Sequence, residues 1–144
     1  MVAAGRIAKV LGGPLVLGRR VASLADLSEV VSGGLPKISL RMTVQRIFPE
    51  GVGHRKLLYR IVPEATLKRR RNRLTPAESE RTERLARVVA AAEYVWGDPS
   101  DARRFLTTLH PALGGQAPID AAMTELGARR VEELLASIEH GLPA

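Results

Sequence analysis

The sequence of 144 residues contains no cysteine. Without a thiol the chain has no disulfide framework, no thiolate zinc site and no cysteine nucleophile. Long apolar runs are also missing, because no stretch approaches the ~20 apolar residues of a membrane span. Residues 1–20 resemble a signal peptide only loosely, since Gly12, Gly13 and Pro14 interrupt a short apolar part and the cleavage site is poor. We therefore expect a cytoplasmic protein that is neither secreted nor inserted in a membrane.

Aromatic residues are few, with one Trp, two Tyr and two Phe. Most of them fall on the apolar stripes of predicted helices, which leaves little surface on which single-stranded bases would stack. We expect Trp96 and Phe105 to fill a helical core, because large aromatic side chains dominate burial. The alternative is that one of them anchors an interface with a partner protein.

Residues that would carry catalysis or bind a metal are not grouped in the sequence. His54, His110 and His140 lie far apart and follow no metal-ligand spacing. Glu132 and Glu133 are neighbours on a predicted helix, so they point apart and cannot act as a paired acid and base. Residues 51–56 resemble a phosphate-binding loop but lack its spacing and its Ser or Thr. We predict that the chain is not an enzyme and needs no cofactor or metal.

Charge is distributed unevenly along the chain. Residues 1–74 hold fifteen Lys and Arg against four Asp and Glu, a net charge of +11. Residues 75–144 hold seven against eleven, a net charge of −4. A strongly basic segment indicates a polyanionic partner, most simply nucleic acid, whereas the acidic segment needs a different role.

The clearest helix signal covers residues 75–96. Thr75 is a predicted N-cap, Pro76 suits the first helical position, and Glu78 completes a capping box. Apolar residues then recur at helical spacing and predict one buried face, and Gly97 is the expected stop. The apolar residues of this face are Leu85, Val88, Val89, Ala92, Val95 and Trp96.

The basic segment is predicted to contain several helices. Ser23 and Asp26 predict the start of a helix that ends at Gly33-Gly34. Residues 37–48 fit a helix or, by their alternation at period two, a strand, and we favour helix because the neighbouring segments are helical. The cluster at residues 49–53 predicts a turn.

Residues 54–73 fit a helix-turn-helix, with helices over 54–62 and 65–73. Lys and Arg neutralise phosphates, and the few residues that a helix presents to the major groove read base edges. The alternative is an ordinary solvated basic face. The predicted DNA-binding residues are Arg55, Lys56, Glu64, Thr66, Lys68, Arg69, Arg70, Arg71 and Arg73.

The acidic segment is predicted to be helical as well. Asp98 caps a short helix whose apolar side is Phe105, Leu106 and Leu109, and residues 110–117 form a loop. We expect a helix over 118–126 that Gly127 ends, and then an amphipathic helix over 128–140.

Motifs of the C-terminal half resemble the toxin-binding domain of Xre/ParS/MbcA-type antitoxins. These motifs are Thr75-Pro-x-Glu-Ser-x-Arg, Val95-Trp-Gly, Phe105-Leu, Pro111-Ala-Leu-Gly-Gly-x-x-Pro and Thr124-x-x-Gly-x-x-x-Val-x-x-Leu-x-x-Ile-x-x-Gly141. Upstream, Gly34-Leu-Pro and Val62-Pro-x-x-Thr-Leu-x-x-Arg70 are similar to the Xre helix-turn-helix of the same proteins. The family often has Trp-Leu in place of Phe105-Leu106 and Asn-x-Ala-Leu in place of His110-Pro-Ala-Leu.

The resemblance implies the antitoxin of a type II toxin–antitoxin pair. Its implied partners are a RES-domain toxin, which consumes NAD and is encoded by the adjacent gene, and the promoter DNA of the shared operon. The resemblance further implies that the antitoxin occludes the active site of the toxin, that it represses the operon, and that it forms a homodimer. The rival interpretations are a free-standing helix-turn-helix regulator and a non-specific nucleic-acid-binding protein.

We therefore expect an all-α protein with an Xre-like helix-turn-helix half and a small toxin-binding half. The expected parts are a weakly ordered lead-in over 1–22, a DNA-binding half over 23–74, a toxin-binding domain over 75–141 and a free tail over 142–144. Exposed helical positions beside the C-terminus make up the predicted toxin interface. They are Arg129, Arg130, Glu133, His140, Gly141, Leu142, Pro143 and Ala144.

Overall fold

The computed structural model describes residues 2–141. The predicted toxin-contact residues Leu142, Pro143 and Ala144 lie outside the described residues. Over residues 2–141 the chain is helical and has no strand, which confirms the all-α prediction. The elements are α1 (Ala4–Val10), α2 (Gly13–Leu17), α3 (Leu24–Ser32), α4 (Lys37–Gln45), α5 (Val52–Ile61), α6 (Glu64–Arg69), α7 (Pro76–Trp96), α8 (Pro99–Thr107), the 3-10 turn η1 (Pro111–Leu113), α9 (Pro118–Ala121) and α10 (Glu125–Glu139).

Helix α7 is the central helix of the molecule. The predicted capping box is present: Thr75 Oγ1 accepts from Glu78 N at 3.2 Å, and Glu78 Oε1 accepts from Thr75 N at 2.9 Å. Gly97 ends the helix with a left-handed φ of 72°, a conformation that favours glycine. The capping residues Thr75 and Glu78 and the stop at Gly97 therefore predicted both ends of the helix correctly.

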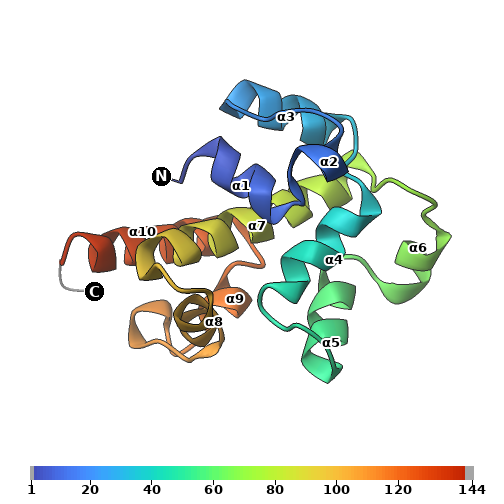
Figure 1. Cartoon of the computed structure of the whole chain (residues 1–144). Helices are drawn as coiled ribbons and strands as arrows, with labels where there is room; N and C mark the ends of the chain where they lie inside the picture. Colours follow the sequence, from blue (N-terminus) through green and yellow to red (C-terminus); the bar gives the residue numbers. More distant parts are fainter. Residues whose placement is uncertain (1, 142–144) are drawn as a thin grey trace.

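Helices from both ends of the chain pack on α7. Its neighbours are α1, α3, α4 and α5 from the basic segment, and α8 and α10 from the acidic segment. Figure 1 shows α7 crossing the middle, with α1 and α3 above it, α8 below it and α10 alongside it. Buried apolar residues of both segments join in one cluster, so α7 contributes to a core that the two halves share.

The N-terminal segment differs from the prediction. Residues 1–22 were expected to be a weakly ordered lead-in, but α1 and α2 are regular and pack on the core. Ile7, Val10 and Leu11 recur at helical spacing and are buried, and α1 lies against α7. The prediction was wrong because Gly12 and Gly13 were interpreted as interrupting a pattern, whereas they form the left-handed corner between two short helices.

Helices α3 and α4 lie in the predicted segments, and residues 37–45 of the ambiguous segment 37–48 are helical rather than a strand. Helix α5 begins at Val52, within the predicted turn over 49–53, and ends at Ile61. The second helix of the predicted helix-turn-helix is shorter than expected, since α6 ends at Arg69 instead of Arg73. Arg70 has an extended conformation, the chain bends at residues 71–72, and residues 72–74 bond to the α3–α4 loop. Leu74 N donates to Leu35 O at 2.9 Å, and Lys37 N donates to Asn72 O at 2.8 Å.

The C-terminal segment is confirmed in part. Asp98 caps α8 as predicted, and η1 lies in the expected loop. The predicted helix over 118–126 is wrong, because α9 ends at Ala121 and Thr124 caps a new helix, α10, which continues through Gly127. A Cβ on Gly127 would lie 1.7 Å from Ala121 O, so this glycine permits close packing instead of ending a helix.

Three large apolar residues of the predicted helices are exposed. Leu109 and Leu126 are 69% and 70% exposed, and Trp96 is 40% exposed. The ring centroid of Trp96 lies 5.9 Å from that of Phe105, which is buried as predicted. Each of the three lies at or next to an end of a helix, where helical spacing no longer determines which side faces the core.

Candidate functional site

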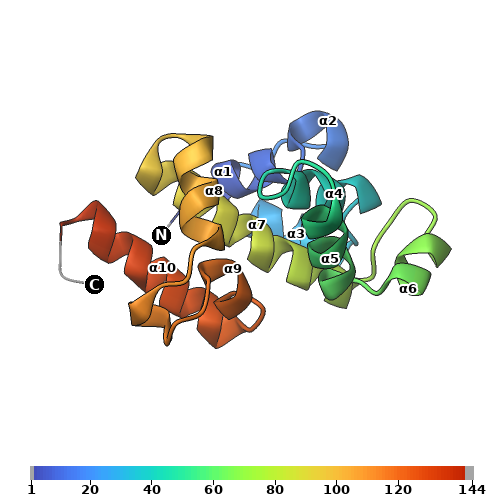
Figure 2. The ribbon, with the colours of Figure 1, turned by 90° about the horizontal axis from the view of Figure 1, so that it is seen from below.

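Two exposed surfaces contain the residues that the sequence singled out. The first, the basic surface, is formed by α5, α6 and the segment that follows α6. Figure 2 shows these elements together at one end of the molecule, away from α10. Residues 54–73 contain eight Lys and Arg but one acidic residue, Glu64.

The structure divides the predicted DNA-binding residues into two groups. Four cations are exposed and make no side-chain hydrogen bond or ion pair with any residue from 2 to 141; they are Arg55, Lys56, Arg69 and Arg71. The others have intramolecular contacts. Lys68 pairs with Glu64 at 2.8 Å, Arg73 Nη1 donates to Gly34 O at 2.8 Å, and Arg70 binds Glu78. Thr66 is half-buried.

Arg70 therefore has a structural role that its sequence context did not indicate. Its Nε and Nη2 atoms donate to Glu78 Oε1 and Oε2, each at 2.9 Å. This bidentate contact, together with the bond from Thr75 N, lowers the pKa of Glu78 to about 2 against the opposing effect of its burial. The same carboxylate thus caps α7 and holds the end of the basic segment against it.

The second surface is the outer face of α10. Arg129, Arg130, Glu133 and His140 are exposed on it, as is Gly141 just beyond the helix. Arg130 Nη2 donates to Ala112 O at 3.1 Å, which attaches η1 to this face. The exposed Leu126 belongs to the same face, whereas the prediction placed residue 126 at the end of a separate helix over 118–126. The positions between them, Ala128, Val131, Leu134 and Leu135, are buried.

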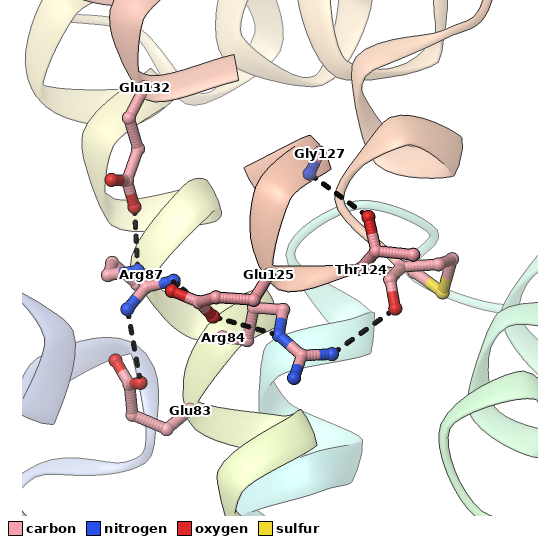
Figure 3. A network of polar contacts seen from close by, with 8 residues as sticks. Glu83, Arg84, Arg87, Thr124, Glu125, Gly127 and Glu132 are labelled. Carbon is pink, nitrogen blue, oxygen red and sulfur yellow. Dashed lines mark hydrogen bonds and ion pairs between the residues drawn. The ribbon is translucent and has the colours of Figure 1, made fainter. Parts of the chain in front are cut away.

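A charged network fixes α10 on α7, as Figure 3 shows. Arg87 Nη2 donates to Glu125 Oε1 at 2.9 Å, and its Nε lies 2.6 Å from Glu132 Oε1. Arg87 also pairs with Glu83 one turn earlier, at 3.7 Å. Arg84 Nε donates to Glu125 Oε2 at 3.2 Å.

Burial raises the pKa of Glu83 although Arg87 lies beside it. The network was missed from the sequence, where the spacing of Glu83 and Arg87 was the only available signal. Its effect is to hold the outer face of α10 in a fixed orientation relative to the core.

Within the described part of the chain, no cluster of His, Asp or Glu has the composition of a metal site. No described helix is long and apolar enough to cross a membrane. Neither surface contains an arrangement of nucleophile and base.

Comparison with known proteins finds a family match in the C-terminal segment. Residues 91–141 match the model of a family described as the antitoxin Xre/MbcA/ParS C-terminal toxin-binding domain. The matched segment includes the last turns of α7 and all of α8, η1, α9 and α10, and thus the outer face of α10.

Two curated relatives have similar sequences. A protein named Antitoxin Xre from Yersinia enterocolitica is 39% identical over 85 residues, which cover 56% of this chain and 57% of the relative. A second Antitoxin Xre, from Pseudomonas putida, is 38% identical over 84 residues, which cover 56% of this chain and 53% of the relative. The chain thus spans a little over half the length of the relatives it matches.

Proposed function

Because residues 91–141 match an antitoxin toxin-binding domain and two proteins named Antitoxin Xre are 39% and 38% identical to part of the chain, we propose that it is the antitoxin of a type II toxin–antitoxin pair. It binds and neutralises a RES-domain toxin that consumes NAD, by covering the active site of that toxin. It also binds the promoter DNA of the shared operon and represses it. The observation that carries the proposal is that the segment matching a toxin-binding domain presents one rigid, exposed face.

Toxin binding is assigned to the outer face of α10. Arg129, Arg130 and Glu133 are exposed charged side chains on this face, and His140 and Gly141 extend it toward the C-terminus. The ion pairs of Arg87 fix the helix before the partner arrives, so little conformational entropy is lost on association. The exposed Leu126 adds an apolar contact at the start of the same face. The tail over 142–144 completes the proposed interface.

DNA binding is assigned to the basic surface. Arg55, Lys56, Arg69 and Arg71 have no acidic partner within residues 2–141 and are available to phosphates. Each phosphate that they neutralise releases condensed counterions, which provides most of the affinity. A homodimer would place two such surfaces on two half-sites of an operator. The two activities use opposite ends of the molecule, so one chain can hold DNA and toxin at once.

Co-expression of the chain with the product of the adjacent reading frame tests the proposal. We expect the two proteins to purify as one complex, and we expect the cellular NAD concentration to fall when the neighbour is expressed alone but not when both are expressed. A neighbour that is harmless alone and forms no complex would contradict the toxin-binding function. The basic surface would then favour a free-standing helix-turn-helix regulator.

A further inference from the structure

Three arginines line a cavity of about 230 Å³ between the two halves of the molecule. Arg60 comes from α5, and Arg81 and Arg84 come from α7. The remainder of the wall is apolar and is formed by Ile61, Leu85, Ala122 and Met123. None of the residues assigned above to DNA binding or toxin binding lines this cavity.

Each of the three guanidinium groups is oriented by a partner. Arg60 Nη1 donates to Asp120 Oδ1 at 2.6 Å, and Arg81 Nε donates to Ile61 O at 2.9 Å. Arg84 donates through Nε to Glu125 and through Nη1 to Met123 O, both at 3.2 Å, as Figure 3 shows in part. An arginine has five N–H donors, so each of these groups keeps donors for a further acceptor.

Arg81 differs from its two neighbours in having no acidic partner. It is half-buried, and its one side-chain bond within residues 2–141 goes to a neutral carbonyl. A partly desolvated cation without a counter-ion is unfavourable, and an anion in the cavity would compensate it. Across the whole cavity, three guanidinium groups face two carboxylates, Asp120 and Glu125, so a net positive charge remains.

The cavity suits a small ligand. Its volume is below the ~300–1,000 Å³ of sites that enclose drug-sized molecules. Planar guanidinium groups match the oxygens of a phosphate group in a bidentate manner. The apolar wall of Leu85, Ala122 and Met123 would contact a short carbon portion attached to that phosphate.

We propose that this cavity binds a small phosphomonoester, with Arg60, Arg81 and Arg84 holding the phosphate group. The ligand would contact α5 of the basic half and the α9–α10 corner of the toxin-binding half at the same time. It therefore supplements the direct ion pair of Arg60 with Asp120, which joins the two halves at this place. The proposal goes beyond the antitoxin function and does not depend on it.

The test uses the full chain alone, labelled with ¹⁵N and titrated with inorganic phosphate and with glycerol 3-phosphate. Chloride and sulfate at matched ionic strength are the reference salts. We expect saturable shifts of the Nε–Hε signals of the three cavity arginines, at least fivefold tighter binding of glycerol 3-phosphate than of phosphate, and no saturable shift with chloride or sulfate. Arg81→Gln should weaken binding at least tenfold, whereas Arg104→Gln, on the exposed side of α8, should change it less than twofold.

Equal responses to sulfate and phosphate, or shifts that do not saturate, would overturn the proposal. If Arg81→Gln does not fold, the signals of the wild-type chain still decide the question, because they report on each cavity arginine directly. A short DNA duplex that shifts the same signals and displaces the phosphomonoester would instead make the cavity part of the DNA interface, and this outcome also rejects the proposal. None of these measurements requires the toxin, so failure here leaves the proposed function untouched.

Discussion

Arg70 and Glu78 form a bidentate ion pair that closes the basic segment onto the start of α7. The pair joins the end of the predicted DNA-binding region to the capping box of the central helix. Since Glu78 is only 4% exposed, the pair is shielded from solvent on the carboxylate side. The pair should therefore contribute more to the free energy of unfolding than the 0–1 kcal/mol that is typical of a surface ion pair.

The first prediction concerns Glu78→Gln. We expect it to lower the free energy of unfolding at pH 7 by about 2 kcal/mol, because Arg70 loses its charged partner and the cap weakens. The pKa of Glu78 is lowered from 4.5 to about 2, so its contribution is full above pH 4.5 and is lost as the pH falls toward 2. Wild-type stability should consequently fall by about 2 kcal/mol more between pH 7 and pH 3 than that of the variant.

Urea unfolding at both pH values measures this difference. Glu80→Gln is the matched control, since Glu80 lies on the exposed side of the same helix turn. Its stability should stay within about 0.5 kcal/mol of the wild type. If Glu78→Gln retains the pH dependence of the wild type, the ion pair does not control it.

The second prediction concerns DNA binding by the basic surface. Replacing both Arg69 and Arg71 by Gln should weaken promoter binding and should reduce the slope of log K against log salt by about 2 per protomer, since each lost phosphate contact contributes ~0.9. Fluorescence anisotropy with a promoter fragment at several salt concentrations measures the slope. Arg104→Gln removes a charge on the opposite half and should leave the slope unchanged; an equal reduction there would indicate only a net-charge effect.

The third prediction concerns the outer face of α10. Arg129→Glu should weaken toxin binding at least 30-fold, which corresponds to about 2 kcal/mol at an interface hot spot. Toxin neutralisation in co-expressing cells and binding measured by calorimetry both report the effect. Arg20→Glu reverses an exposed charge elsewhere and should bind normally. Full neutralisation by Arg129→Glu would exclude this position from the interface.

The fourth prediction concerns Gly127→Ala. A Cβ at this position would meet Ala121 O at 1.7 Å, so the start of α10 must move away from α9. We expect a loss of about 3 kcal/mol of unfolding free energy from such overpacking, measured by thermal or urea unfolding. In Gly5→Ala, within α1, the nearest atom is Val21 O at 3.7 Å, and stability should stay constant or rise by up to about 1 kcal/mol. Similar effects of both substitutions would contradict the steric explanation.

Local signals predicted the helices wherever the cap and the apolar pattern agreed. Thr75, Glu78 and Gly97 defined α7 because capping depends on residues close together in sequence. The same rules failed at Gly127, since only the approach of Ala121 shows that this glycine lies inside a helix. The early end of α6 was missed for a similar reason: residues 72–74 bond to the α3–α4 loop, almost forty residues earlier in the chain.

The composition of the sequence predicted where the candidate surfaces lie, but it did not predict which contacts their residues make. A run of arginines does not indicate which members pair internally, so Arg70 and Arg73 were grouped with Arg69 and Arg71. Arg70 differs from Arg69 and Arg71 because it bonds to the buried Glu78, and Arg73 differs because it bonds to the carbonyl of Gly34. The cavity arginines belong to segments more than twenty residues apart, and sequence spacing carries no signal for such a cluster.

Because both halves pack on α7, one half cannot easily be exchanged for the corresponding half of a homologue. Both halves bury their apolar residues on the same 21-residue helix, so no flexible linker separates them at which one half could be exchanged for that of a homologue. A chimera would have to be joined inside α7 and match the packing on two sides at once. New operator preferences and new toxin preferences should therefore arise by substitution on the outer surfaces and not by exchange of modules.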